Sequence, residues 1–88
     1  MNEKILERVL KAMANRRRLA VLKFLKKAKE ASVGEIANEI KLSLNATSKH
    51  LLILSAAGII DREQRSLQMY YSLLPHMPEV ARRVIALF

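Results

Sequence analysis

Apolar residues in the segment Val33–Ile60 recur at helical spacing, and the rest of the chain is arranged around this segment. In its first half they fall at i, i+3, i+4 and i+7, which is one face of a helix: Val33, Ile36, Ala37 and Ile40. Ser32 and Glu35 precede and enter this run as an S-x-x-E pattern, in which the serine hydroxyl caps the helix and the glutamate reaches back. The pattern predicts a short amphipathic helix that begins just after Ser32.

A brief interruption separates this helix from a second one. Lys41 and Leu42 break the apolar spacing, and Ser43 can cap the helix that follows. Gly58 ends it, because glycine readily adopts the left-handed conformation found after helix C-termini. Its core-facing side is predicted to hold Thr47, Leu51 and Leu54, with Asn45 and Lys49 pointing the opposite way. Two short amphipathic helices joined by a tight turn predict a helix-turn-helix.

Two more helices are predicted before this unit. Asn2 can cap one that runs to about Ala14, and Asn15 can cap another that runs to about Lys27. The segment Lys26–Ala31 is predicted to be a charged connection into the helix-turn-helix. The apolar face of the first helix consists of Ile5, Leu6, Val9, Leu10 and Met13.

After Gly58 the apolar period changes from helical to alternating. Ile59–Arg62 and Gln68–Leu73 are predicted to be strands, with Glu63–Leu67 as the tip of the hairpin between them. Pro75 and Pro78 break the second strand and start a last helix, whose apolar side holds Val80, Val84, Ile85 and Phe88. The order predicts a mainly α (α+β) fold, a winged helix-turn-helix with a two-stranded wing and an extra helix at each end. We expect a single domain over residues 1–88.

The apolar fraction and its distribution indicate self-association. The chain has 88 residues of which 51% are hydrophobic, whereas a domain of this size buries only about 60–65% of its unfolded surface. Much of the apolar surface lies on the two terminal helices, more than so small a core needs. We therefore expect a homodimer whose interface is formed by Ile5, Leu6, Val9, Met13, Val80, Val84, Ile85 and Phe88.

Charge indicates the class of partner. Sixteen lysines and arginines face eight aspartates and glutamates, so the net charge is +8 and favours a polyanion, most commonly nucleic acid. The plainer alternative is a basic surface that only confers solubility. The absence of cysteine excludes disulfides and thiolate metal sites. No apolar run approaches the ~18 residues of a membrane span, and no signal peptide is recognisable, so we expect a cytoplasmic location.

Four segments together resemble the ArsR family of small winged-helix transcriptional regulators. They are LKAMANRRRLAVLKFL (residues 10–25), SVGEIANEI (32–40), LSLNATSKHLLILSAAGII (42–60) and MYYSL (69–73), in the family's order and spacing. The sequence departs from the family pattern at Arg16 and Arg17, which replace a Pro-Thr pair, at Leu44 and Leu52, which replace polar residues, and at a wing tip without glycine.

The resemblance implies contacts with double-stranded DNA. The helix-turn-helix is the part of the family's fold that reads DNA and is called the reading unit below. The family's contacts carry over onto four residues of its second helix and cap, Ser43, Asn45, Ser48 and Lys49. Asparagine pairs with adenine and lysine with guanine in the major groove. Arg62 and Arg65 on the wing are the candidates for phosphate contacts, although two ordinary exposed arginines are nearly as good an interpretation. His50 is interpreted as a packing or hydrogen-bonding residue.

No metal, cofactor or catalytic centre is predicted. The cysteine positions of the family's metal sensors hold Ser32 and Gly34, and the segment Glu79–Phe88 contains one carboxylate and no histidine. No glycine-rich phosphate loop, nucleophile–base pair or carboxylate dyad is present, so no enzyme is predicted.

Three functions are compatible with these patterns. The favoured one is a homodimeric repressor that occludes its operator, with any effector shifting the dimer between binding and non-binding geometries. The second is an architectural DNA-binding protein held mainly by charge, which would show little preference between sequences. The third is a protein-interaction module, which Leu44 and Leu52 on the second reading-unit helix would favour.

Overall fold

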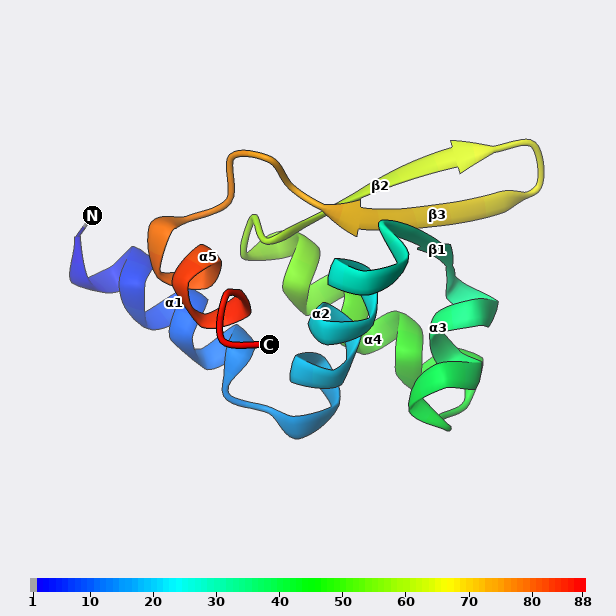
Figure 1. Cartoon of the computed structure of the whole chain (residues 1–88), viewed down its shortest axis with the longest axis horizontal. Coiled ribbons are helices and arrows are strands. Elements are labelled where there is room, and N and C mark those ends of the chain that lie inside the picture. Colours follow the sequence, from blue (N-terminus) through cyan, green and yellow to red (C-terminus); the bar gives the residue numbers. More distant parts are fainter. Residues whose placement is uncertain (1) are drawn as a thin grey trace.

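The structure, a computed structural model, describes residues 2–88. In these residues, five helices lie against one face of a small antiparallel sheet. The strand order is β1-β3-β2. Figure 1 shows α1 and α5 at one end of the molecule and the hairpin of β2 and β3 projecting toward the other. The elements are α1 (Glu3–Met13), α2 (Arg16–Ala28), β1 (Glu30–Ser32), α3 (Val33–Ile40), α4 (Leu44–Ala56), β2 (Ile60–Arg65), β3 (Gln68–Leu73) and α5 (Glu79–Ile85).

Side-chain caps begin four of the helices at the positions that the sequence predicts. Asn2 Oδ1 accepts a hydrogen bond from the Ile5 amide at 2.9 Å, and Asn15 Oδ1 accepts from the amides of Arg17 and Arg18 at 3.0 and 3.1 Å. The other two caps are the reciprocal capping box of Ser32 with Glu35, and Ser43, whose Oγ accepts from the Ala46 amide. These bonds satisfy amide donors that a helix N-terminus otherwise leaves free.

Residues with a positive φ follow both helices of the reading unit, α3 and α4. Lys41 follows α3 with φ 56°, and Gly58 follows α4 with φ 74°. Between the two helices only Lys41, Leu42 and Ser43 lie outside helical structure, which fixes a tight turn. The predicted helix-turn-helix is therefore confirmed, with both of its helices within one or two residues of their expected bounds.

The core lies between α2, the reading-unit helices and the sheet. Its largest fully buried side chains include Leu22, Leu25, Ile36, Leu51, Leu54 and Ile59. They come from α2, α3, α4 and the residue before β2, so the inward face of α4 is held by apolar contacts with the other elements. Burial of this kind contributes roughly 1.5–3 kcal/mol per large aliphatic side chain.

Helix α2 is fastened near both ends by side chains of its own. Near its start, Arg18 Nε donates to the carbonyl of Ala12 in α1 at 2.6 Å. Near its end, Lys26 Nζ donates to the carbonyls of Ile85 and Phe88 at 3.2 and 2.8 Å. The last carbonyls of a helix lack internal partners and attract cations, so Lys26 caps the C-terminal end of α5.

The segment Lys26–Ala31, predicted to be only a charged connection, contains the end of a helix and a strand that the sequence did not predict. Helix α2 continues to Ala28, and Glu30–Ser32 forms the edge strand β1, which pairs antiparallel with β3. A strand of three residues is too short for an alternating pattern, and its partner lies about 40 residues later, so local sequence carries little trace of it.

The wing is longer and its tip shorter than predicted. Strand β2 extends to Arg65 and the register pairs Arg65 with Gln68, so the turn contains only Ser66 and Leu67. Ser66 takes the positive φ of 57° that such a turn requires, in place of glycine. The residues from Asp61 to Gln68 are all exposed, so no apolar alternation marked the outer part of the strands.

Three residues of the expected dimer interface lie inside the protomer. Val9, Met13 and Ile85 are only 1%, 4% and 5% exposed, because α1 and α5 pack against each other and the core. These three side chains therefore have almost no surface left to bury against a second subunit. Of the remaining five, Ile5 and Phe88 are exposed and Leu6, Val80 and Val84 are partly buried.

Candidate nucleic-acid interface

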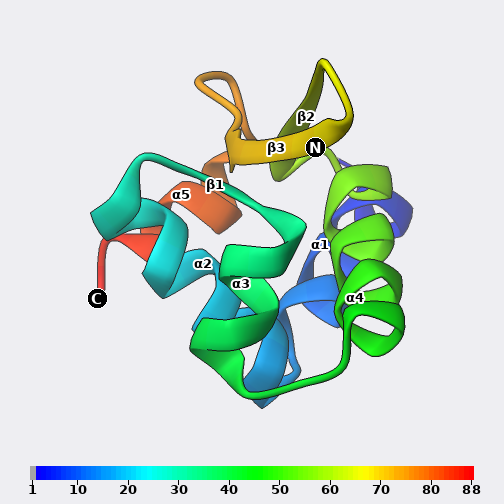
Figure 2. The same cartoon turned by 90° about the vertical axis from the view of Figure 1, so that its right-hand side faces the viewer.

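Helix α4 is divided into a buried and an exposed side, as predicted. Thr47, Leu51 and Leu54 are completely buried, whereas Asn45, Ser48 and Lys49 are exposed. Figure 2 shows α4 along one side of the molecule, beside α3 and beneath the hairpin. The exposed Ser43 caps the helix, so its hydroxyl is already bonded to the Ala46 amide at 3.1 Å. The structure thus brings the four expected base-reading residues onto one end and one face of α4.

His50 holds a hydrogen bond between elements. Its Nδ1 lies 3.2 Å from an Nη of Arg18. Because a guanidinium can only donate, Nδ1 must be the acceptor and therefore unprotonated. Burial lowers the pKa of His50, and the nearby charges of Arg18 and Arg17 lower it further. The histidine thus links α4 to α2 as a neutral ring, in agreement with the structural interpretation.

The two wing arginines lie in different surroundings. Arg62 is exposed and forms no ion pair within residues 2–88. Arg65 instead donates to both carboxylate oxygens of Glu30 at 2.7 Å and to Glu63 Oε1 at 2.8 Å, with its guanidinium 4.8 Å from the centre of the Tyr70 ring. The hydrogen bonds that Arg65 donates to Glu30 and Glu63 raise the pKa of Arg65 above its already high ordinary value. Of the two wing arginines, Arg62 is therefore the one without an ion-pair partner within residues 2–88.

Lys41 is a candidate contact that sequence reasoning treated only as a helix break. Its exposed side chain lies in the turn between α3 and α4, beside a groove of about 670 Å³ that Leu44 also borders. A cation in so tight a turn is the only local signal that could have identified it. Leu44 itself is 58% exposed.

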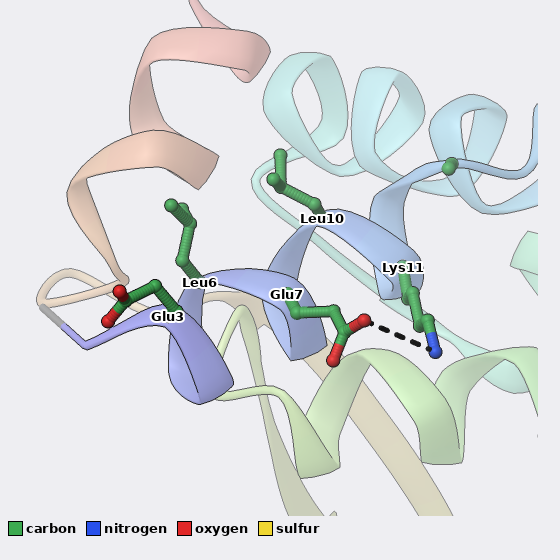
Figure 3. A pocket seen from close by; sticks show the side chains of 6 residues that line it. Glu3, Leu6, Glu7, Leu10 and Lys11 are labelled. Carbon is green, nitrogen blue, oxygen red and sulfur yellow. Dashed lines mark ion pairs between the residues drawn. The ribbon is translucent and has the colours of Figure 1, made fainter.

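An apolar groove runs along α1 at the opposite end of the molecule. Leu6, Leu10 and Ala14 line it, with Glu3, Glu7 and Lys11 at its rim, and its volume is about 330 Å³. Figure 3 shows Leu6 and Leu10 projecting from one side of α1, with the Glu7–Lys11 ion pair beside them. Leu10 is 44% exposed, so the terminal helix retains apolar surface that its own protomer does not cover.

The described residues contain neither a cluster of possible metal ligands nor a helix that could span a membrane. Within residues 2–88 no three histidine, cysteine, aspartate or glutamate side chains gather closely enough to hold a metal ion. The Ser32 hydroxyl accepts a hydrogen bond from the Glu35 amide at 3.2 Å and so caps α3. No helix in the described part of the chain combines the length and apolar character needed to cross a membrane.

Comparison with known proteins places these features in a family. A family model described as "Helix-turn-helix domain" matches residues 13–63. The transcriptional activator HlyU of Vibrio cholerae is 40% identical over 65 residues, which is 74% of this chain and 59% of HlyU. The chain thus spans about three fifths of the length of that relative.

Solved structures match almost the whole chain. Reduced HlyU from Vibrio cholerae has a TM-score of 0.83 at 34% identity, covering 98% of this chain and 86% of that one. Mb0332 from Mycobacterium bovis, described as a homodimeric winged helix-turn-helix DNA-binding domain and a possible ArsR-family regulator, has a TM-score of 0.82 at 31% identity, covering 96% and 74%. The chain belongs to the helix-turn-helix family of ArsR-type winged-helix transcriptional regulators.

Proposed function

We propose that this protein is a sequence-specific DNA-binding transcriptional regulator that acts as a homodimer. The observation that carries the proposal is the division of α4, whose buried side is locked into the core while Asn45, Ser48 and Lys49 stand free on the other. A rigid helix that presents short polar side chains and one lysine suits the major groove. An operator that overlaps a promoter would be occluded by the bound dimer, which represses transcription.

Each polar residue has a distinct role in this proposal. Asn45 pairs with adenine, Lys49 with guanine, and Ser43 and Ser48 bond to phosphate or a base edge at the groove. Arg62 supplies a phosphate contact from the wing, and Lys41 a second one from the turn of the reading unit. Arg65, which is neutralised by two carboxylates, holds the wing in position instead of binding phosphate.

The dimer is proposed to form through the exposed apolar surface of α1 and α5. Ile5, Leu6, Val80, Val84 and Phe88 remain in the interface, and Leu10 joins them because it lines the groove on α1. Two-fold symmetry places the two copies of α4 about 34 Å apart, one turn of DNA. The operator is then an inverted repeat with half-site centres about 10 base pairs apart, or a multiple of that.

Selection from a random DNA pool followed by binding measurements with single variants tests the proposal. Lys49→Ala lowers affinity for the selected operator by about 1–3 kcal/mol while random DNA changes little, because a base contact is lost. Lys23→Ala, which removes an exposed lysine from α2, serves as the matched control for charge alone. Equal losses on both DNAs with Lys49→Ala would favour the architectural function, and no DNA binding at all would favour a protein-interaction module.

A further inference from the structure

Leu44 is an exposed aliphatic residue at the N-terminus of α4, the helix proposed to enter the major groove and called the recognition helix below. It is the first residue of α4 and is 58% exposed, although the core around α4 is otherwise well packed. Its neighbours on the outer surface are Asn45 and, one turn later, Ser48. It also borders the concave groove between α3 and α4, together with Lys41 and Asn38. More than half of the Leu44 surface is thus left accessible by residues 2–88.

The surroundings of Leu44 match a polyanion better than a protein surface. Helix α4 contains no carboxylate and carries Lys49, and Lys41 stands in the adjoining turn. An apolar protein partner would have to bury these two lysines beside Leu44 without compensation, which is costly. DNA instead supplies phosphates for the lysines and base edges for the residues between them.

We propose that Leu44 is a specificity-determining residue that recognises the 5-methyl group of a thymine in the major groove, an inference that rests on the proposed DNA-binding function. The N-terminal residues of a recognition helix reach the base edges. A leucine side chain can neither donate nor accept a hydrogen bond, and the thymine methyl is the apolar group that the major groove presents. Asn45 is expected to pair with adenine, so the first turn of α4 recognises A·T pairs through two neighbouring side chains, Asn45 and Leu44.

Leu52 provides a matched comparison within the same helix. It is also aliphatic and 61% exposed, but lies eight residues later, about 12 Å along the helix axis from Leu44. It borders a different groove, near the base of the wing, together with the carboxylate residue Asp61. The two leucines thus share their chemistry and exposure and differ in their position on α4.

Replacing thymine by deoxyuridine tests the inference because it removes only the methyl group. In a selected operator, each thymine is replaced in turn in both half-sites, and dissociation constants are measured by fluorescence anisotropy for the wild type, Leu44→Ala, Leu44→Met and Leu52→Ala. For the wild type, one position in each half-site costs about fourfold per methyl, or roughly fifteenfold for both. Leu44→Ala abolishes this uracil effect, whereas Leu44→Met and Leu52→Ala retain it. Circular dichroism checks that each variant is folded.

The outcomes separate this inference from the proposed function. Sequence-specific binding with no uracil-sensitive thymine, or with the same sensitivity in Leu44→Ala, overturns the inference and leaves the function standing. Loss of the uracil effect in Leu52→Ala instead of Leu44→Ala also overturns it. If selection yields no preferred sequence, the proposed function and the inference both fail.

Discussion

Arg65 and Glu30 join the two outer strands of the sheet through a bidentate ion pair. Both hydrogen bonds to the Glu30 carboxylate measure 2.7 Å, although the residues lie 35 positions apart in the chain. Because β3 lies between β1 and β2, the arginine crosses the central strand, with its guanidinium over the ring of Tyr70. The pair is about half exposed, so water and salt screen it, and its main effect is on where the wing points.

The first prediction compares the two wing arginines. Arg62→Ala lowers the slope of log affinity against log salt by about 0.9 for each subunit, because one phosphate contact is lost. Arg65→Ala leaves this slope nearly unchanged, since the charge of Arg65 is already balanced by Glu30 and Glu63. Binding titrations of both variants over a salt series measure the difference. Equal reductions of the slope would show that Arg65 leaves its carboxylates to bind phosphate.

The second prediction concerns acid. The pKa of His50 is lower in the folded protein than its ordinary value of 6.5, so the unfolded chain takes up the proton first. The contribution of the Arg18–His50 bond is therefore complete above about pH 6.5 and is lost as the pH falls through the lower, folded-state pKa. Urea denaturation between pH 5 and 8 checks this. His50→Gln, which can accept from Arg18 without titrating, flattens this part of the pH profile.

The third prediction concerns a buried hydroxyl. Thr47 is fully buried, and its Oγ1 has no hydrogen-bond partner within residues 2–88. Thr47→Val keeps the shape and removes the desolvated polar atom, so the free energy of unfolding rises by about 1 kcal/mol. Ser32→Ala, which removes a bonded cap hydroxyl, lowers it by about the same amount. A loss of stability in Thr47→Val would reveal an undetected partner of the hydroxyl.

The fourth prediction concerns backbone strain at the end of α2. Lys29 has φ 76° and ψ −49°, a conformation that L-residues adopt only at a cost and glycine adopts freely. Lys29→Gly therefore raises the free energy of unfolding, by roughly 1 kcal/mol. Lys27→Gly removes the same charge from the last helical turn and lowers it by about 0.5–1 kcal/mol. Thermal or urea denaturation of the two variants gives the opposite signs directly.

The fifth prediction concerns assembly. Leu10 is 44% exposed in the protomer, so Leu10→Glu leaves the fold intact but places a charge in the proposed apolar interface. Sedimentation or light scattering at micromolar concentration then shows a monomer, with a normal circular dichroism spectrum. Ala20→Glu makes the same change of charge on the exposed side of α2 and leaves the dimer in place. Val84 is a poorer site for this test, because it packs partly against its own core.

Local signals in the sequence were sufficient for the helices and for the sides of α4. Caps such as Asn15 and Ser43 act on amides within three residues, and the periodicity of Thr47, Leu51 and Leu54 reflects one helix face. Both kinds of information are contained in short windows of sequence. For the same reason the exposed set around Asn45 and Lys49 followed from spacing alone.

Other features depend on residues far apart in the chain and could not be predicted in this way. The strand at Glu30–Ser32 exists because β3 pairs with it, and the neutralisation of Arg65 depends on Glu30. Periodicity also cannot distinguish a face buried within the protomer from one buried by a partner. Val9 and Ile5 share the same apolar stripe of α1, yet the first is 1% exposed and the second 46%.

Hydrogen bonds near both ends of α2 connect this helix to distant parts of the protomer. Arg18 ties the start of α2 to α1 and, through His50, to the recognition helix, while Lys26 ties its far end to the last residues of the chain after α5. Helix α2 thus connects the surfaces that are proposed to pair two subunits with α4, the helix that is proposed to enter the major groove. The distance between the two copies of α4 in the proposed dimer then depends on these contacts within each subunit as well as on the interface. In the proposed dimer, a change at either end of α2 would therefore alter the preferred half-site spacing without touching a base contact.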